Sequence, residues 1–130
     1  MVTSFFVYGT LKQGQRNEGV WPAKPRSISP GWVHGRLYSR ADYPAMIDGT
    51  DQVLGELWTF ASADIDKVIE ALDWLEGTNQ PGRADLYRRV ISAAYNLEHQ
   101  QMTQAYLYLY ETDPEREGFT RAVGATISWP

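Results

Sequence analysis

The sequence predicts an α+β domain, a small mixed β-barrel of about six or seven strands with one main helix packed against it. Three observations support this fold class. Short apolar segments rich in Val, Tyr, Phe and Trp recur between turn-forming residues, as is typical of strands. A single segment, residues 63–75, has the spacing of an amphipathic helix. In residues 105–110, tyrosines alternate with alanine and leucine, so we expect both faces of that strand to be covered, as in a closed sheet.

The N-terminal half is predicted to contain most of the strands. Residues 4–8 form a short apolar strand that ends at Gly9. Residues 14–30 are rich in Gly, Pro, Asn and Ser and are predicted to form a long loop with one helical turn near residues 17–20. A loop of this length in a small domain is often functional. Turns are expected at residues 42–44 and 48–51, and they separate three further strands: residues 31–39, 45–47 and 53–60.

The predicted helix has its apolar residues on one face. Five of them follow the helical period: Ile65, Val68, Ile69, Leu72 and Leu75. We expect Ser62 or Asp64 to cap the start of the helix, and Gly77 to end it in the left-handed conformation. A loop at residues 79–83 then leads to three predicted strands: residues 86–95, 102–110 and 122–129.

The composition restricts the class of protein. The chain has 130 residues, of which 43% are hydrophobic, and it is predicted to form one domain over residues 1–130. A net charge of −4 with dispersed basic residues argues against nucleic-acid binding. The sequence contains no cysteine, which excludes disulfides, thiolate catalysis and Cys-bound zinc. We see no signal peptide and no membrane span, so we expect a cytoplasmic protein that does not bind membranes.

The segment Tyr8-Gly9-Thr10-Leu11, directly after the first strand, has two interpretations. The structural one is a tight turn in which Gly9 tolerates a positive φ. The functional one is that successive backbone N–H groups at the end of the strand form a site for an anion or a carbonyl oxygen. The segment lacks the G-x-x-x-x-G-K-[ST] spacing of a phosphate-binding loop.

Glu76 lies at the C-terminal end of the predicted helix, with Asp73 one turn before it. The helix dipole, partial desolvation and the neighbouring like charge would each disfavour ionisation, so we expect a raised pKa for Glu76. A carboxylate of this kind suits a general acid–base. The alternative is an exposed glutamate in the last turn without a role, and the pattern alone does not separate the two.

The other polar residues indicate neither a metal site nor an enzyme nucleophile. His34 and His99 have no partner at metal-ligand spacing, so we predict no metal and no cofactor. No G-x-S-x-G elbow is present, which disfavours a serine hydrolase. Among the aromatic residues, Tyr38, Tyr43 and Tyr87 are candidates to line a pocket.

Six short segments spread over nearly the whole chain carry a resemblance to a known family: Val7-Tyr8-Gly9-Thr10-Leu11-Lys12-Gln13-Gly14, Gly35-Arg36-Leu37-Tyr38, Tyr43-Pro44-Ala45, Val53-Leu54-Gly55-Glu56-Leu57-Trp58, Leu72-Asp73-Trp74-Leu75-Glu76-Gly77 and Tyr87-Arg88-Arg89-Val90. In this order and spacing they resemble the γ-glutamylcyclotransferase-like superfamily, which includes the AIG2-like proteins and γ-glutamylamine cyclotransferase.

The resemblance implies a γ-glutamylcyclotransferase-like fold and an enzyme of the acyltransferase or lyase kind. Such enzymes convert a γ-glutamyl amide into 5-oxoproline and a free amine, because the α-amine of the substrate attacks its own γ-carbonyl group. By position, the general acid–base of the family corresponds to Glu76. The residues that would bind the substrate correspond to Tyr8, Gly9, Thr10, Leu11 and Tyr87. The implied partner is a small-molecule γ-glutamyl substrate, and the protein is expected to be a monomer or a homodimer.

Two segments depart from the family pattern. Residues 125–130 retain only Trp129 of the Gly-Asp-Trp ending that we would expect, and the loop at residues 14–30 has no counterpart. Both departures concern the side of the pocket that would receive the leaving amine, so the resemblance does not assign that amine. The alternative function is a non-catalytic module that binds a γ-glutamyl-like metabolite in the same cavity.

Overall fold

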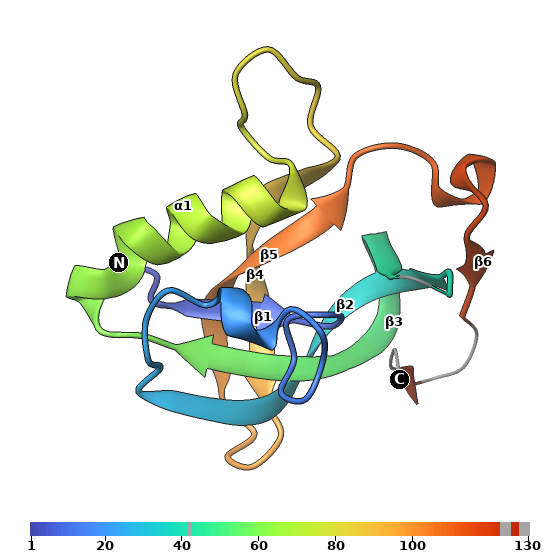
Figure 1. Cartoon of the computed structure of the whole chain (residues 1–130). Coiled ribbons are helices and arrows are strands. Elements are labelled where there is room, and N and C mark those ends of the chain that lie inside the picture. The colour runs from blue at the N-terminus through green and yellow to red at the C-terminus, as the bar shows by residue number, and fades with distance from the viewer. Residues whose placement is uncertain (42, 123–125, 128–130) are drawn as a thin grey trace.

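A computed structural model describes residues 1–41, 43–122 and 126–127, and five of its strands close into a barrel. β1 (Ser4–Val7) pairs antiparallel with β3 (Pro44–Thr59) and parallel with β5 (Met102–Tyr110). β4 (Tyr87–Asn96) lies between β5 and β2 (Ser27–Ser39). The ring closes because β2 pairs with both β4 and β3 (Figure 1). The predicted mixed β-barrel is therefore confirmed.

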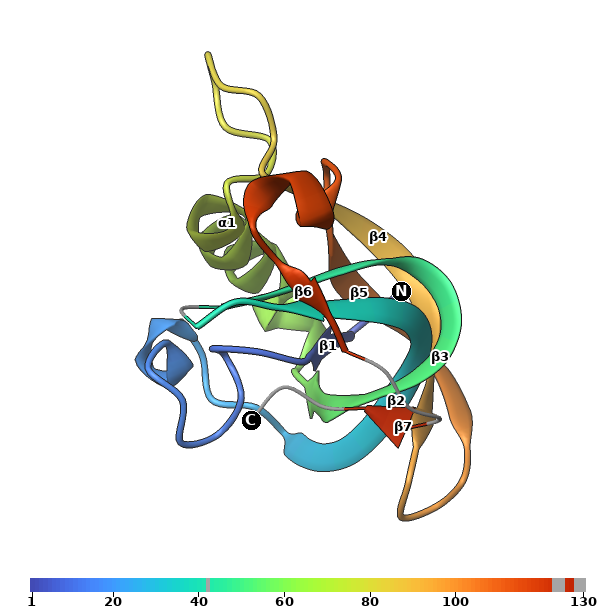
Figure 2. The same ribbon diagram turned by 90° about the vertical axis from the view of Figure 1, so that its right-hand side faces the viewer.

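Two short strands extend this ring within the described residues. β6 (Thr120–Arg121) pairs with the end of β2, and β7 (Thr126–Ile127) pairs with β3 (Figure 2). Of the strand predicted at residues 122–129, only β7 is observed. Residues 123–125 and 128–130 lie outside the described residues, and with them most of the C-terminal segment that departs from the family pattern.

The turn predicted at residues 48–51 is wrong, because β3 continues through it. Gly35 of β2 pairs with Asp51, whereas the next residue, Arg36, pairs with Ile47, so residues 48–50 form a bulge inside one long strand. A Cβ atom on Gly49 would lie 2.8 Å from the Cβ of Arg36 and from the carbonyl carbon of Gly35. Glycine at this position therefore permits the close approach that the bulge requires, and a bulge bends a strand in the way that a closed barrel needs.

The predicted loop at residues 14–30 is too long at its C-terminal end. β2 begins at Ser27, and residues 27–30 pair with residues 56–59 of β3. β4 pairs with β2 only at Gly31 and Trp32, so at Pro30 only one edge of β2 is paired, and its partner there is β3. A proline is tolerated there because its missing N–H group interrupts no second ladder. The helical turn predicted near residues 17–20 is confirmed as η1 (Glu18–Val20).

The predicted helix is confirmed as α1 (Ile65–Glu76), which follows a short 3-10 turn, η2 (Ser62–Asp64). Gly77 ends it with the expected left-handed conformation, at φ 64°. Of the two predicted N-cap residues, Asp64 takes the N-cap position, although its side chain does not cap the helix. Ser62 lies within η2, and Asp64 makes no capping hydrogen bond but instead contacts the Nζ atom of Lys67 at 3.4 Å.

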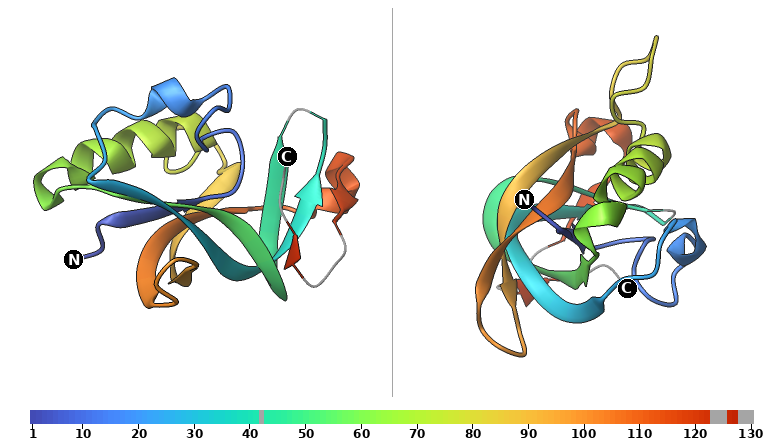
Figure 3. Two further views of the ribbon diagram at one scale, coloured as in Figure 1. Left: turned by 90° about the horizontal axis from the view of Figure 1, so that it is seen from below. Right: turned by 90° about the vertical axis from the view of Figure 1, so that its left-hand side faces the viewer.

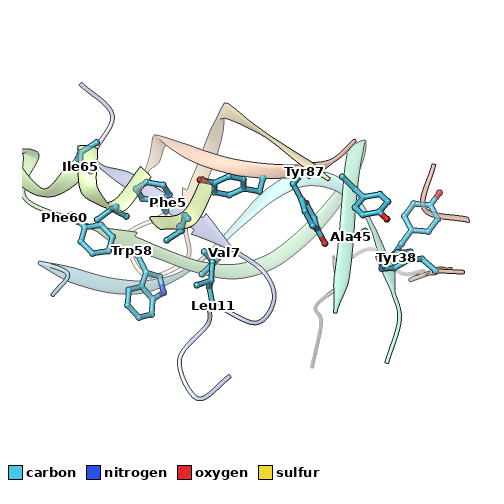
Figure 4. Packing of buried hydrophobic residues seen from close by; sticks show 14 residues of the cluster. Phe5, Val7, Leu11, Tyr38, Ala45, Trp58, Phe60, Ile65 and Tyr87 are labelled. Carbon is cyan, nitrogen blue, oxygen red and sulfur yellow. The ribbon is translucent and has the colours of Figure 1, made fainter. Parts of the chain in front are cut away.

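Buried apolar residues form two clusters on opposite faces of the barrel strands. The first packs between α1 and the strands, and Figure 4 shows Phe5, Phe60 and Ile65 close together within it. The second contains the side chains on the other face of the same strands, including Leu107 and Leu109 of β5. The alternation predicted for β5 is confirmed, because its three tyrosines belong to the first cluster and its alanine and leucines to the second. In addition, η3 (Pro114–Glu117) precedes β6 and was not expected.

Candidate active site

A cavity of about 180 Å³ opens between the last turn of α1 and the segment that follows β1. This segment and α1 lie on the same side of the barrel (Figure 3). The lining residues come from parts of the chain that are far apart in sequence: Phe6, Val7, Tyr8, Gly9, Thr10, Leu11, Arg16, Asn17, Tyr43, Pro44, Leu75, Glu76, Leu86, Tyr87 and Tyr108. All six predicted site residues are among them, so the fold brings together side chains that the sequence separates by as many as 79 positions, from Tyr8 to Tyr87.

The turn after β1 is held through its carbonyl groups. The backbone N–H of Lys12 donates to the Gly9 carbonyl at 3.1 Å, and the indole N–H of Trp21 donates to the Leu11 carbonyl at 3.1 Å. Asn17 binds Thr10 twice, from its backbone N–H to the carbonyl and from its side-chain amide to the hydroxyl, each at 2.9 Å.

The N–H groups of the same turn belong to residues that line the cavity. Those of residues 9–11 have no acceptor among the residues that the structure describes. A run of N–H groups left open beside a cavity is an arrangement that binds anions. The tight turn predicted at this position is present, because the Lys12 N–H binds the Gly9 carbonyl. Gly9 itself does not have a positive φ, and the residue that takes the left-handed conformation in this loop is Gly14, at φ 81°.

Glu76, the last residue of α1, lines this cavity. Burial raises the pKa of Glu76 from 4.5 to about 7. Within the described part of the chain, no hydrogen bond or ion pair reaches the carboxylate. The predicted direction of the shift is therefore found, and its cause is desolvation. Asp73 does not contribute to the raised pKa as predicted, because its carboxylate is bound by Arg89 at 2.5 Å and by the Tyr108 hydroxyl at 2.6 Å.

Three tyrosines that line the cavity have their hydroxyl protons committed to protein acceptors. Tyr8 donates to the Tyr108 carbonyl at 2.7 Å, and Tyr87 donates to the Pro44 carbonyl at 2.8 Å. Tyr108 donates to Asp73. Burial raises the pKa of all three phenols, reinforced by the charge of Glu76 at Tyr8 and Tyr87 and mainly by Asp73 at Tyr108, so they remain neutral near pH 7. Each phenol oxygen therefore has only lone pairs left to offer to a ligand.

The other sequence predictions about this region have mixed outcomes. Tyr43 lines the cavity as proposed, but Tyr38 does not, because it is buried in the packed cluster where β2 meets β6. Asn17 and Arg16 were missed. They lie in the loop without a family counterpart, and no local signal in that loop shows that it folds back against Thr10.

The described residues contain no group of three or more His, Cys, Asp or Glu side chains that could hold a metal ion. His34 instead packs edge-on against the Trp32 ring on the outer surface, with ring centres 5.0 Å apart. Among the helices in the described ranges, none combines the length and the hydrophobicity that crossing a membrane requires.

Comparison with known proteins identifies the class. The model of the family described as gamma-glutamyl cyclotransferase, AIG2-like, matches residues 5–125, and the chain belongs to this family. A search of curated proteins found no match.

Solved structures with the same fold include an AIG2-like protein from Mus musculus, with a TM-score of 0.70 and 22% identity, covering 92% of this chain and 85% of that one. The protein YtfP from Escherichia coli has a TM-score of 0.55 and 23% identity, covering 95% and 94%. A structure named gamma-glutamyl cyclotransferase has a TM-score of 0.56 and 12% identity, covering 92% and 69%. At these identities the likenesses concern the fold.

Proposed function

We propose that the protein is a γ-glutamyl cyclotransferase that converts a γ-glutamyl amide into 5-oxoproline and a free amine, with Glu76 as general acid and base. The observation that carries this proposal is a buried carboxylate with a pKa of about 7, without a pairing partner among the described residues. It shares one cavity with the open N–H groups of the turn after β1. Membership of the gamma-glutamyl cyclotransferase, AIG2-like family supports the same class of reaction.

In this mechanism the ionised Glu76 takes a proton from the α-ammonium group of the substrate. The freed amine attacks the γ-carbonyl carbon, so that a new C–N bond closes a five-membered ring. The tetrahedral intermediate then loses its original C–N bond while Glu76 returns its proton to the departing nitrogen. The ionised Glu76 next takes the extra proton from the ring nitrogen and passes it to the released amine, which leaves as an ammonium ion. The substrate and the two products carry the same number of protons in total, so one carboxylate is sufficient. A pKa near 7 allows Glu76 both to accept and to donate a proton near neutral pH.

The turn after β1 would stabilise negative charge in this reaction. The N–H groups of residues 9–11 would bind the oxyanion of the intermediate or the α-carboxylate of the substrate. The lone pairs of Tyr8 and Tyr87 would face the ammonium group, because their protons already bind protein acceptors. The cavity would also hold the glutamyl chain in a folded shape, which lowers the entropic part of the barrier by several kcal/mol, as a rough magnitude.

The experiment that tests this function is the release of 5-oxoproline from a panel of γ-glutamyl amides. The panel contains γ-glutamyl amino acids, γ-glutamyl conjugates of lysine side chains and γ-glutamyl polyamines. The α-glutamyl isomers are the matched substrate control, since their amine and carbonyl group are placed differently. We expect turnover of at least one γ-glutamyl compound, and a decrease in kcat of about 10²–10⁴ in Glu76→Gln, the usual contribution of a positioned acid–base group.

The same panel decides between catalysis and binding alone. If a γ-glutamyl compound binds in the cavity while no 5-oxoproline forms, the protein is a binding module and the proposed reaction is wrong. Equal turnover by Glu76→Gln and the wild type would remove Glu76 from the mechanism while leaving the reaction itself in place.

A further inference from the structure

One turn before Glu76, α1 carries a second carboxylate that faces the barrel. Asp73 is buried, with 8% of its surface exposed. It accepts three hydrogen bonds: from Arg89 of β4 at 2.5 Å, from the Tyr108 hydroxyl of β5 at 2.6 Å and from the side chain of Asn79 at 3.4 Å. The last turn of the helix is therefore attached to two strands of the barrel through one side chain.

Stability alone does not account for a charged group at this position. The rest of the buried face of α1 is apolar, and Ile65, Val68 and Leu72 pack against the barrel there. Burying an ion pair costs desolvation, and well-packed apolar residues are often at least as stabilising. What the ion pair and its hydrogen bonds add is direction, because they allow only a narrow range of positions for the helix end relative to the strands.

Tyr108 connects this helix end to the turn after β1. Its hydroxyl group donates to Asp73, three residues before Glu76. Its backbone carbonyl accepts from the hydroxyl of Tyr8, the first residue of the turn. Both bonds are buried, and Tyr108 itself lines the cavity. A single residue of β5 thus holds both halves of the site.

We infer that Asp73 and Tyr108 are positioning residues, which set the distance between the Glu76 carboxylate and the N–H groups of residues 9–11. This inference rests on the proposed function. If the helix end moved away from the barrel, the proton acceptor and the anion site would separate, and water would enter between them. A displacement of about 1 Å in a reacting group can lower the rate of an enzyme about 100-fold.

Tyr108→Phe is the most direct test, because it removes one hydroxyl group and changes no charge. The groups that face Glu76 are Tyr8, Tyr87 and Tyr108, with Arg16 and Tyr43 elsewhere in the cavity lining and the Asp73–Arg89 pair one turn away. All the charges among them stay in place in this variant. A change in the titration of Glu76 would therefore report its position and hydration.

Tyr106→Phe is the matched control. Tyr106 lies on the same face of β5, and its ring contacts Phe5 at a tilt of 39° and the Arg89 guanidinium, contacts that phenylalanine retains. It is absent from the cavity lining, so its hydroxyl group has no part in the inference. A second variant, Asp73→Asn combined with Arg89→Gln, removes both charges of the buried pair together. It serves as an independent test of the same attachment.

Three quantities are measured for each variant: kcat and KM with a γ-glutamyl substrate, the titration midpoint of Glu76 by carboxyl ¹³C NMR, and Tm. In Tyr108→Phe we expect kcat to fall about 10- to 100-fold, with a smaller change in KM. We also expect the titration midpoint of Glu76 to fall from about 7 toward 4.5, because water reaches the carboxylate. Tyr106→Phe should match the wild type in both respects.

A merely structural role would lower Tm and leave the other quantities unchanged. If Tyr108→Phe has the same kcat and the same Glu76 titration as Tyr106→Phe, the inference is overturned, whatever happens to Tm. If the wild type turns over no γ-glutamyl amide, the proposed reaction is wrong, but the NMR titration still tests whether Tyr108 positions Glu76. A shifted midpoint then supports the positioning role, and an unchanged one removes it.

Discussion

Replacing Glu76 by glutamine should make the protein more stable at alkaline pH while it lowers kcat by about 10²–10⁴. The folded state raises the pKa of Glu76 from 4.5 to about 7, so the folded protein holds this proton more tightly than the unfolded chain does. The stability of the wild type associated with this group is therefore complete below about pH 4.5 and is lost as the pH rises through 7. Glutamine keeps the shape of the side chain without the charge, so Glu76→Gln should escape this loss.

The size of the effect follows from the two pKa values. Each tenfold change in proton affinity corresponds to about 1.4 kcal/mol, so the difference between 4.5 and about 7 corresponds to about 3 kcal/mol once the group is ionised in both states. Glu76 as a whole is only partly buried, so we expect about 2 kcal/mol of this to be observed. For a chain of this length, that is a difference in Tm of about 6–10 °C.

The assay compares thermal or urea unfolding of the wild type and Glu76→Gln between about pH 4 and pH 8. Burying the glutamine amide can change the free energy of unfolding by an amount that does not depend on pH. Such a change does not affect the prediction, which concerns how the difference in unfolding free energy between the two proteins varies with pH. Exposed Glu70→Gln, on the outer face of α1, is the control and should show no such change. A stability difference that stays the same across this pH range would refute the claim that the carboxylate is desolvated.

Four further outcomes are expected. The value of kcat/KM should decrease as the pH falls through about 7, because the free enzyme needs an ionised Glu76, and a flat profile over that range would contradict its role as base. Gly9→Val should raise KM severalfold while Tm changes little, because Gly9 lines the cavity without a left-handed φ; unaltered substrate affinity would count against the turn as a binding site. Gly55→Ala should destabilise the fold by about 2–4 kcal/mol in urea unfolding, since its Cβ would lie 2.3 Å from the carbonyl oxygen of Val7. A soluble variant that is as stable as the wild type would disprove that contact. Leu72→Ala, at a fully buried position under α1, should cost about 2–5 kcal/mol in the same assay, and a loss below 1 kcal/mol would mean that the helix packs less closely than described.

The candidate site was predicted from two sources of different strength. The end of the helix at Glu76 and Gly77 follows from local pattern, because apolar spacing and a left-handed glycine mark a C-terminus. Physical reasoning on the sequence left open whether Glu76 faces a cavity, and the family resemblance alone favoured a role for it. Asn17, which holds Thr10 in place, was missed, because nothing in a loop sequence shows where the loop folds back.

Some features of the fold were decided by the sequence itself. The period-two alternation in β5 and the apolar stripe of α1 predict which side chains are buried, and the structure buries those side chains. This is possible because the side of a strand or helix that faces the core is marked by the apolar residues of that segment itself. The class of fold and the position of its helix follow from such patterns.

Other features depended on tertiary structure alone. Residues 48–50 look like a turn, yet they bulge within β3, because strand β2 pairs on both sides of them. The sequence places Asp73 one turn from Glu76, which suggests two neighbouring negative charges, yet the Asp73 carboxylate binds Arg89 and Tyr108 instead. In each case the local sequence permits two conformations or two side-chain directions of similar free energy, and partners distant in sequence decide between them when the barrel closes.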